Sequence, residues 1–314
     1  MKRLFGILGV ALLATACGSA GTPVDPAPVA EVIRPQPAHV GGADLKPDAA
    51  KNDCDRPLAS LAPQGKSITG TMAKIKERGH LIAGVDQTTF LFGFRNPVSG
   101  DLEGFDIDMA KQVAKAIFGD ENKIRFRAIP SKQREDVLKE KQVDIVVRTY
   151  SINCSRLKDV AFSSVYYQAG QRILVDKDSR VKSLPDLANK KVCATKTSTS
   201  LTAIATNPAK PVPVSVDNWS DCLVMLQQGQ VDAVSTDDVI LAGMAAQDPT
   251  VRVVGDAFTT ESYGIGIPKE NEDMVRFVNA VLEDVRGNGT WKQSYDHWLG
   301  GRLQPADPPQ PAYK

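Results

Sequence analysis

Two stretches of the sequence, 136–150 and 222–238, repeat one scheme in which a helix leads into a buried strand. The first reads DVLKEKQVDIVVRTY and the second CLVMLQQGQVDAVSTDD, and each passes through Gln-Val-Asp before its apolar strand. Such joints reuse few turn solutions, so chance is a rival explanation for so short a match. We interpret the repeat as two lobes of similar build, with strands and helices in alternation, which predicts an α/β fold.

Length and charge limit the kind of partner. The chain has 314 residues, of which 42% are hydrophobic, so it can bury a large core and is long enough for two lobes. Thirty-eight basic residues against 37 acidic ones leave a net charge of +1, and no Lys/Arg block rises above the background. We therefore expect no nucleic-acid partner, and we expect a small ligand.

The first 17 residues are typical of a secretory signal peptide. Lys2 and Arg3 precede the apolar run 4–13, and small residues follow up to Cys17. Cys17 stands where the bacterial lipobox places its lipidated cysteine, although Ala14 replaces the usual leucine three positions earlier. An ordinary signal peptide with an incidental cysteine is the alternative. No later segment reaches the roughly 18 apolar residues of a membrane span.

Residues 18–53 are rich in Pro, Ala, Gly and Val and show no helical or strand period. Such a segment buries too little apolar surface to fold alone, so it predicts a flexible tether between lipid and folded body. We therefore expect an extracytoplasmic protein that is held by a lipid anchor on the outer face of the cell membrane.

The remaining cysteines are even in number, which in an exported chain permits two disulfides and three connectivities. We favour Cys193 with Cys222, because both lie in one stretch on a strand and a helix of one proposed lobe, and then Cys54 with Cys154 by elimination. Zinc is the rival reading, but no CxxC spacing and no nearby histidine supports it.

The folded body alternates helices and strands. A helix is predicted over 71–79, a strand over 80–86, an amphipathic helix over 104–119 and a strand over 123–130, and this order implies a mainly parallel sheet covered on both faces. Near the end, Trp291, Tyr295 and Trp298 form a stripe at helical spacing, which we interpret as packing.

Polar residues gather around 131–156, where a short helix, a buried strand and a polar turn follow one another. Arg134, Thr149, Ser151 and Arg156 are delivered toward one place, which suits a small anionic group. In the second copy of the repeat the strand ends in Asp237 and Asp238. Open α/β sheets bind ligands at the carboxyl ends of strands, so the two polar ends are expected to line one cleft.

Seven blocks in order carry a family resemblance: GVDQTTFLFGF, EGFDIDMAKQVA, SKQR, VDIVVRTYSINCSRLKDVAFS, LPDLANKKVCATKTSTS, QVDAVSTDD and YGIGIPK. Over 73–299 the chain resembles the extracytoplasmic solute-binding proteins of polar amino-acid ABC importers, close to the glutamate/aspartate and glutamine binders. The resemblance implies a two-lobed Venus-flytrap fold with two hinge crossovers, near 165–170 and 258–263. Lobe one would comprise 54–167 and 262–314, and lobe two 168–261.

The resemblance also implies roles for residues at matching positions. Arg156 matches the arginine that takes the ligand α-carboxylate, and Asp237 the acid that pairs with the α-ammonium, with Asp238 as the fallback. Thr149 and Ser151 lie on the preceding turn, where the family uses a backbone carbonyl for the ammonium and an amide or hydroxyl for the carboxylate. The second lobe closes on that carboxylate through a threonine, which here is Thr199.

The preferred ligand stays open because the sequence combines features of the glutamate/aspartate binders and of the glutamine binders. Arg134 and the preceding Ser131 resemble the glutamate/aspartate binders, whereas Asp86 stands where those binders carry an arginine and glutamine binders an aspartate. Glutamate, aspartate, glutamine and asparagine therefore all remain candidates. The residues given secondary roles, each against a plainly structural alternative, are Lys196 near the distal end, Trp219 as a lid-like contact, and Phe90 or Phe92 on the ligand stem.

For partners, the resemblance implies a free polar amino acid that is delivered to an ABC permease, or alternatively reported to a membrane sensor protein. We expect a monomer without cofactor or metal. Enzymes exist on the same scaffold. However, His39, His80 and His297 fall in unrelated places, so no nucleophilic triad is suggested and we expect no enzymatic activity.

Overall fold

The computed structural model describes residues 34–45 and 54–314. The expected signal peptide with Cys17 and most of the expected tether lie outside the described residues. Within the described ranges, none of the helices combines the length and apolar character that a bilayer crossing needs.

The first lobe is built on a five-stranded sheet in the order β6-β2-β7-β16-β8. Its strands are β2 (Leu81–Val85), β6 (Ile124–Ala128), β7 (Ile145–Val146), β8 (Val160–Phe162) and β16 (Gly266–Pro268). The helices of this lobe are α1 (Gly70–Arg78), α2 (Phe105–Phe118), α3 (Arg134–Lys139), α4 (Cys154–Asp159), α8 (Glu272–Gly287) and α9 (Thr290–Trp298). A small sheet joins β3 (Thr88–Thr89), β4 (Gly93–Arg95) and β5 (Leu102–Glu103).

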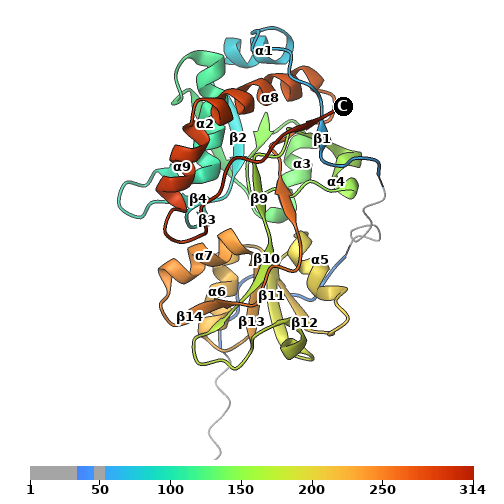
Figure 1. Cartoon of the computed structure of the whole chain (residues 1–314), viewed down its shortest axis with the longest axis vertical. Coiled ribbons are helices and arrows are strands. Elements are labelled where there is room, and N and C mark those ends of the chain that lie inside the picture. The colour runs from blue at the N-terminus through green and yellow to red at the C-terminus, as the bar shows by residue number, and fades with distance from the viewer. Residues whose placement is uncertain (1–33, 46–53) are drawn as a thin grey trace, which may run out of the picture. The chain divides into compact units, whose positions relative to one another are not determined.

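The second lobe repeats this plan in the order β12-β11-β13-β10-β14. Its strands are β10 (Gln171–Asp176), β11 (Lys191–Thr195), β12 (Val212–Val216), β13 (Ala233–Asp237) and β14 (Val251–Val254). Its helices are α5 (Thr199–Ala205), α6 (Trp219–Gln227) and α7 (Asp238–Gln247). Figure 1 shows the two lobes one above the other, and the α/β class is confirmed.

The prediction of mainly parallel sheets is wrong in one respect. β2 runs parallel to β6 and β7, and β11 parallel to β12 and β13, but β16 and β10 each run antiparallel to both of their neighbours. The cause is visible in the register, because Gln171 at the start of β10 pairs with Asp237 at the end of β13. A strand that enters from between the lobes must run away from the cleft, against the strands that end there.

The internal repeat in the sequence is confirmed as a repeat of structure. Asp144 precedes β7, its N–H donates to Ile82 O (2.9 Å), and its carboxylate accepts from Ile82 N (2.7 Å). Asp232 precedes β13 and makes the same two hydrogen bonds with Lys191: its N–H donates to Lys191 O and its carboxylate accepts from Lys191 N, both at 2.8 Å. Each aspartate thus fixes the start of the central strand of its lobe, β7 or β13, to the neighbouring parallel strand, β2 or β11, which explains why the same tripeptide occurs at both joints.

Two short strands cross between the lobes as an antiparallel pair, β9 (Tyr167–Ala169) and β15 (Glu261–Tyr263). Figure 1 shows β9 running from one lobe to the other. Aromatic rings pack around this crossing: Tyr167 stacks on Tyr263 with centroids 5.7 Å apart, and Trp291 donates its indole N–H to Tyr166 O at 2.7 Å. Trp291 and Tyr295 are buried, so the packing interpretation of the aromatic stripe is confirmed.

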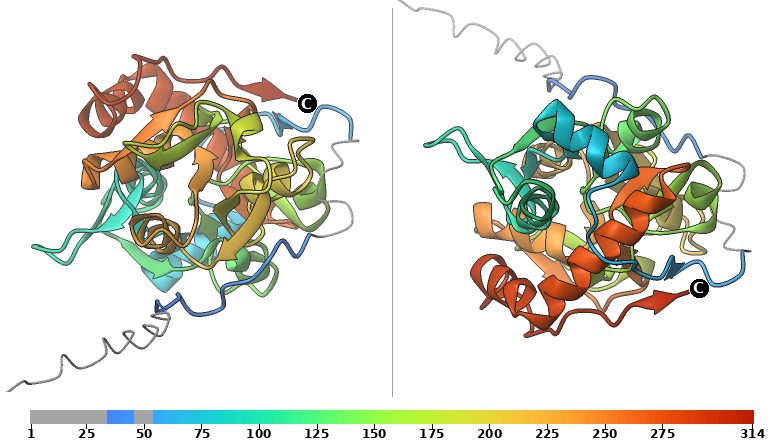
Figure 2. Two further views of the ribbon diagram at one scale, coloured as in Figure 1. Left: turned by 90° about the horizontal axis from the view of Figure 1, so that it is seen from below. Right: turned by 90° about the horizontal axis from the view of Figure 1, so that it is seen from above.

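Both disulfides that the sequence analysis favours are present, Cys54–Cys154 and Cys193–Cys222. The second joins β11 to α6 inside the second lobe. Described residues before Cys54 contact the same lobe, since Gly41 pairs with Ser215 of β12 through hydrogen bonds of 3.0 and 2.7 Å. At the other end of the chain, β17 (Ala312–Tyr313) pairs with β1 (Ala59–Ser60), as Figure 2 shows.

Replacing both Cys193 and Cys222 with alanine should lower the apparent free energy of unfolding of the second lobe. The bridge closes a loop with a sequence separation of 29, and chain entropy for such a loop corresponds to about 3 to 4 kcal/mol. Urea unfolding followed by far-UV circular dichroism measures the difference. An unchanged urea midpoint would show that the bridge contributes nothing to stability.

Candidate functional site

The segments at the carboxyl ends of β7 and β13 meet at Tyr263, whose backbone forms a bridge with Ser151 and whose hydroxyl donates to Asp237. Contacts from neighbouring segments also join the two sides, among them Ser131 Oγ to Thr195 Oγ1 at 3.0 Å, Arg156 Nη2 to Thr197 O at 3.1 Å, and Lys132 Nζ to Asp217 Oδ1 at 3.0 Å. The sequence therefore correctly predicts that these two strand ends meet.

Arg156 lies in α4 and is only 4% exposed. Its Nη1 donates to Ser151 O at 2.6 Å and its Nη2 to Thr197 O at 3.1 Å, while the guanidinium carbon lies 4.9 Å from the centre of the Tyr150 ring. Glu135 Oε1 is 3.7 Å from Nε. The residues that line a pocket together with Arg156 are Asp44, Leu45, Glu135, Asn153, Ser155, Thr197, Ser198, Thr199 and Thr202.

Asp237 ends β13 and is 3% exposed. Its Oδ2 accepts from the Tyr263 hydroxyl, whereas its Oδ1 has no hydrogen-bond partner among the described residues. Burial, and then the neighbouring Glu261 carboxyl, raise the pKa of Asp237 well above its usual range. Glu261 is itself buried and accepts from Thr199 Oγ1 at 2.9 Å. This side of the cleft is thus an acidic pair with one unused acceptor.

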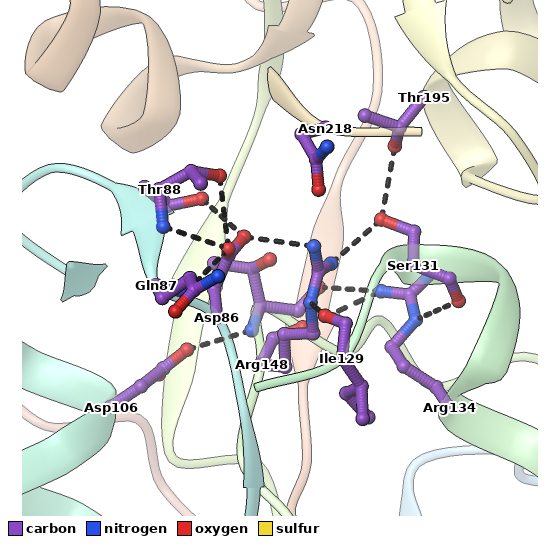
Figure 3. A network of polar contacts seen from close by, with 12 residues as sticks. Asp86, Gln87, Thr88, Asp106, Ile129, Ser131, Arg134, Arg148, Thr195 and Asn218 are labelled. Atoms are coloured by element: carbon purple, nitrogen blue, oxygen red, sulfur yellow. Dashed lines mark hydrogen bonds and ion pairs between the residues drawn. The ribbon is translucent and has the colours of Figure 1, made fainter. Parts of the chain in front are cut away.

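Asp86 and Arg148 form a buried ion pair at the end of β2 and just past β7. Arg148 Nη2 lies 2.9 Å from Asp86 Oδ2, and the two side chains are 0% and 5% exposed. Arg148 Nε donates to Ile129 O at 2.7 Å and Nη1 to Ser131 Oγ at 2.6 Å. Burial lowers the pKa of Arg148, and Asp86 opposes that effect. Figure 3 shows the guanidinium of Arg148 at the centre of this network.

Arg134 is also buried, but its donors are directed to the backbone. Nε donates to Ser131 O at 3.0 Å, and Nη1 to the carbonyls of Arg148 and Thr149 at 3.4 and 3.3 Å. Burial, and then the nearby charges of Arg156 and Arg148, lower the pKa of Arg134 to about 9. Arg134 therefore stays charged at neutral pH and holds the turn that follows β7.

Thr149 adopts a left-handed backbone conformation with φ of 39°, which is uncommon for a residue other than glycine. Its N–H donates to Asp106 Oδ2 at 2.7 Å, and Asp106 Oδ1 accepts from the Tyr166 hydroxyl at 2.6 Å. Asp106 thus ties α2, the cleft turn and the crossing between the lobes together. Burial raises the pKa of the Asp106 carboxyl to about 7.

Three of the predicted residues make other contacts in the structure. Lys196 lies 3.5 Å from Asp217 and donates to His39 O. Trp219 is buried and lines a second pocket with Phe90. Asp238 accepts from its neighbouring Val239 N at 2.8 Å at the start of α7, which is a local backbone contact.

Sequence reasoning missed four residues of the cleft: Arg148, Asp106, Glu261 and Tyr263. A signal existed for Arg148. Aligning the two copies of the repeat places Arg148 opposite Thr236, the residue before Asp237, so the repeat alone puts position 148 at the cleft. Glu261 and Tyr263 belong to the returning crossover and have no counterpart in the repeat.

Comparisons with known proteins agree with this geometry. A family model described as bacterial extracellular solute-binding proteins, family 3, matches residues 81–301. The ABC transporter glutamine-binding protein GlnH of Bacillus subtilis (strain 168) is 40% identical over 235 residues, covering 74% of this chain and 86% of that protein. Glutamate-binding protein GluB of Corynebacterium glutamicum is 34% identical over 243 residues, covering 74% and 82%.

Among solved structures, an ancestral arginine-binding protein bound to glutamine has a TM-score of 0.65 and 35% identity, covering 71% of this chain and 99% of that chain. The region matched by the family model runs from β2 through α9 and contains every residue of the cleft between Asp86 and Tyr263.

Replacing Asp106 with asparagine should flatten the pH dependence of stability. The carboxyl has a pKa of about 7 when folded against a model value of 3.8. Between these values the folded chain holds a proton that the unfolded chain has lost, so stability falls as pH rises through this window and is level above it. An asparagine side chain does not titrate, so the variant should lose less stability across the window. Calorimetric melting temperatures at several pH values test this, and parallel curves for both proteins would refute it.

Proposed function

We propose, because the chain belongs to the bacterial extracellular solute-binding proteins, family 3, that it binds one polar amino acid in the cleft between its lobes and delivers it to an ABC importer. The candidates are glutamate, aspartate, glutamine and asparagine. The observation that carries the proposal is the Oδ1 oxygen of Asp237, which is buried and lacks a hydrogen-bond partner among the described residues. A buried acceptor without a partner is costly, and a ligand ammonium would supply the missing donors.

Arg156 is the proposed anchor for the ligand α-carboxylate. A guanidinium has five N–H groups in a planar fork, and two of those of Arg156 donate to the carbonyls of Ser151 and Thr197. The donors that remain suit the two oxygens of a carboxylate, which bind a guanidinium through parallel charge-assisted bonds. Thr199 and Ser151 stand beside it, with their hydroxyl oxygens 3.5 Å apart across the cleft.

Asp237 and Glu261 are the proposed partners of the α-ammonium. An ammonium carries three donors and one charge, and an isolated acidic pair in a buried place favours such a cation. With Arg156 on the other side, the cleft offers a positive group to the ligand carboxylate and negative groups to the ligand ammonium. An amino acid satisfies both ends at once, whereas a simple acid or amine satisfies one.

Closure about the β9 and β15 crossing is the proposed mechanism, with the lobe boundaries at 167/168 and 261/262. Both sides of the cleft contribute ligand contacts, so the closed form is the one that ligand binding stabilises. The relatives named above for glutamine and glutamate binding support the ligand class. We further propose anchoring through Cys17, a monomeric state, and binding without conversion of the ligand.

Replacing Arg156 with alanine should weaken binding of every amino acid by about 100-fold or more, because it removes one partner of a buried charged contact. Isothermal titration calorimetry with each candidate measures the effect. Arg252→Ala is the matched control, since Arg252 also donates to two carbonyls but on β14, outside the cleft. Wild-type affinity in Arg156→Ala would refute the carboxylate role.

Amino-acid binding should release a proton from Asp237. Burial and Glu261 raise the pKa of Asp237 in the free protein, and an adjacent ammonium favours the ionised carboxylate and lowers that pKa. Affinity should therefore rise with pH up to the raised pKa of the free protein. Calorimetry in two buffers of different ionisation enthalpy detects the released proton. Identical binding enthalpies in both buffers would contradict this account of Asp237.

A further inference from the structure

The cleft contains three buried arginines, and their surroundings give them different roles. Arg156 has an acid within ion-pair distance of it in Glu135, and Arg148 has one in Asp86. Arg134 makes no ion pair with any described residue; its Nε donates to Ser131 O, and its Nη1 donates to the carbonyls of Arg148 and Thr149. The region around Arg134 and Arg148 therefore carries an excess of positive charge beside the ammonium and carboxylate subsites.

Asp86 has no acceptor capacity to spare. Its Oδ1 accepts from Gln87 N, Thr88 N and Thr88 Oγ1 at 2.7, 3.0 and 3.0 Å. Its Oδ2 accepts from Thr89 Oγ1 at 2.6 Å and lies 2.9 Å from Arg148 Nη2. A carboxylate offers about four lone-pair sites, and four hydrogen bonds, with the ion pair to Arg148 beside them, already use this capacity. Asp86 therefore does not read the N–H groups of a ligand amide and acts as the counter-ion of Arg148.

Arg148, by contrast, has donors to spare. Nε and Nη1 each make one hydrogen bond, and Nη2, although close to Asp86, is not aligned to donate a hydrogen bond to any described group. At least one N–H on each terminal nitrogen is thus available, and together they form the edge of the guanidinium that binds a carboxylate through two parallel bonds.

The position of Arg148 is fixed from both lobes. Ser131 Oγ accepts from Arg148 Nη1 at 2.6 Å, and it also forms a hydrogen bond of 3.0 Å with Thr195 Oγ1 in the second lobe. Figure 3 shows Thr195 and Asn218 on the opposite side of the cleft from Arg148, with the Asn218 side chain directed toward it. Closure of the lobes and the orientation of Arg148 are therefore coupled through one hydroxyl group.

From these contacts we infer that Arg148 is the specificity-determining residue of the cleft and that it selects an amino acid whose side chain ends in a carboxylate. The inference rests on the proposed function. A distal carboxylate accepts two bonds from Arg148 and balances the excess positive charge, whereas an amide offers one acceptor oxygen and turns its N–H groups toward a cation. Arg134 is a positioning residue for the Arg148 turn. The ligand class narrows to aspartate and glutamate.

The test is calorimetry of the full chain with aspartate, asparagine, glutamate and glutamine, for wild type and Arg148→Gln. Of aspartate and glutamate, the one that the wild type binds more tightly should also bind more tightly than its own amide. Arg148→Gln should lower this ratio of acid affinity to amide affinity by about 10- to 100-fold. Arg286→Gln is the matched control, since Arg286 is a largely buried arginine that donates to Val165 O and Pro309 O. It should keep the wild-type ratio whatever happens to its stability.

The Asp86→Asn variant tests whether Asp86 is only the counter-ion of Arg148 or also binds the amide group of a ligand. If Asp86 is only the counter-ion of Arg148, the variant should bind the acid more tightly and the amide unchanged. If Asp86 reads the amide, amide affinity should fall, and that result overturns the inference. If Arg148→Gln fails to fold, Arg148→Lys takes its place. Lysine keeps the positive charge but lacks the planar guanidinium, so this variant should also lower the ratio of acid to amide affinity.

The remaining outcomes are distinguishable. A wild type that binds no amino acid refutes the proposed function itself. A wild type that binds an amide more tightly than the acid, or an acid-to-amide ratio unchanged in the Arg148 variants, overturns the role of Arg148 and leaves the proposed function standing.

Discussion

The whole site depends on one constraint, which is that a charge buried in the cleft must find an opposite charge or a full set of hydrogen bonds. The two lobes share one plan, so β7 and β13 bring their carboxyl ends to the same cleft. Arginines follow β7, and Asp237 ends β13. Arginine and acid are thus held apart on different lobes, and the acid is left with an oxygen that no described residue satisfies. In the proposed function, the ammonium of a zwitterionic ligand supplies the hydrogen bond that this oxygen lacks.

The rest of the fold supports this separation. Asp144 and Asp232 fix the starts of β7 and β13 to the neighbouring strands β2 and β11, which sets where β7 and β13 end and which residues enter the cleft. Asp106 holds Thr149 and Tyr166 together, so the arginine-bearing turn and the crossing between the lobes are connected. The aromatic rings around β9 and β15 make that crossing a packed element rather than a loose linker.

The repeated helix and strand scheme predicts the two lobes and the facing polar ends because both depend on local pattern. The sequence does not predict that β10 and β16 run antiparallel, since strand direction follows from which side of the sheet the chain enters. The resemblance predicts Asp86 and Arg134 in the cleft, but it does not predict their contacts with Arg148. From the sequence alone, Arg148 is interpreted as the end of an apolar run, because no local pattern shows that β7 ends at Val146. Glu261 and Tyr263 lie in the segment that crosses back between the lobes. The Tyr263 hydrogen bond and the Glu261 charge therefore reach Asp237 from a distant part of the chain that no repeat relates to it.

The central claim is that the cleft recognises the α-carboxylate and the α-ammonium of one molecule together. The most direct measurement compares glutamate with glutarate, which lacks the amino group, and with 4-aminobutyrate, which lacks the α-carboxylate, by calorimetry on one preparation. The account predicts that glutamate binds and that both analogues lose most of the affinity. Glutarate or 4-aminobutyrate binding as tightly as glutamate would contradict it.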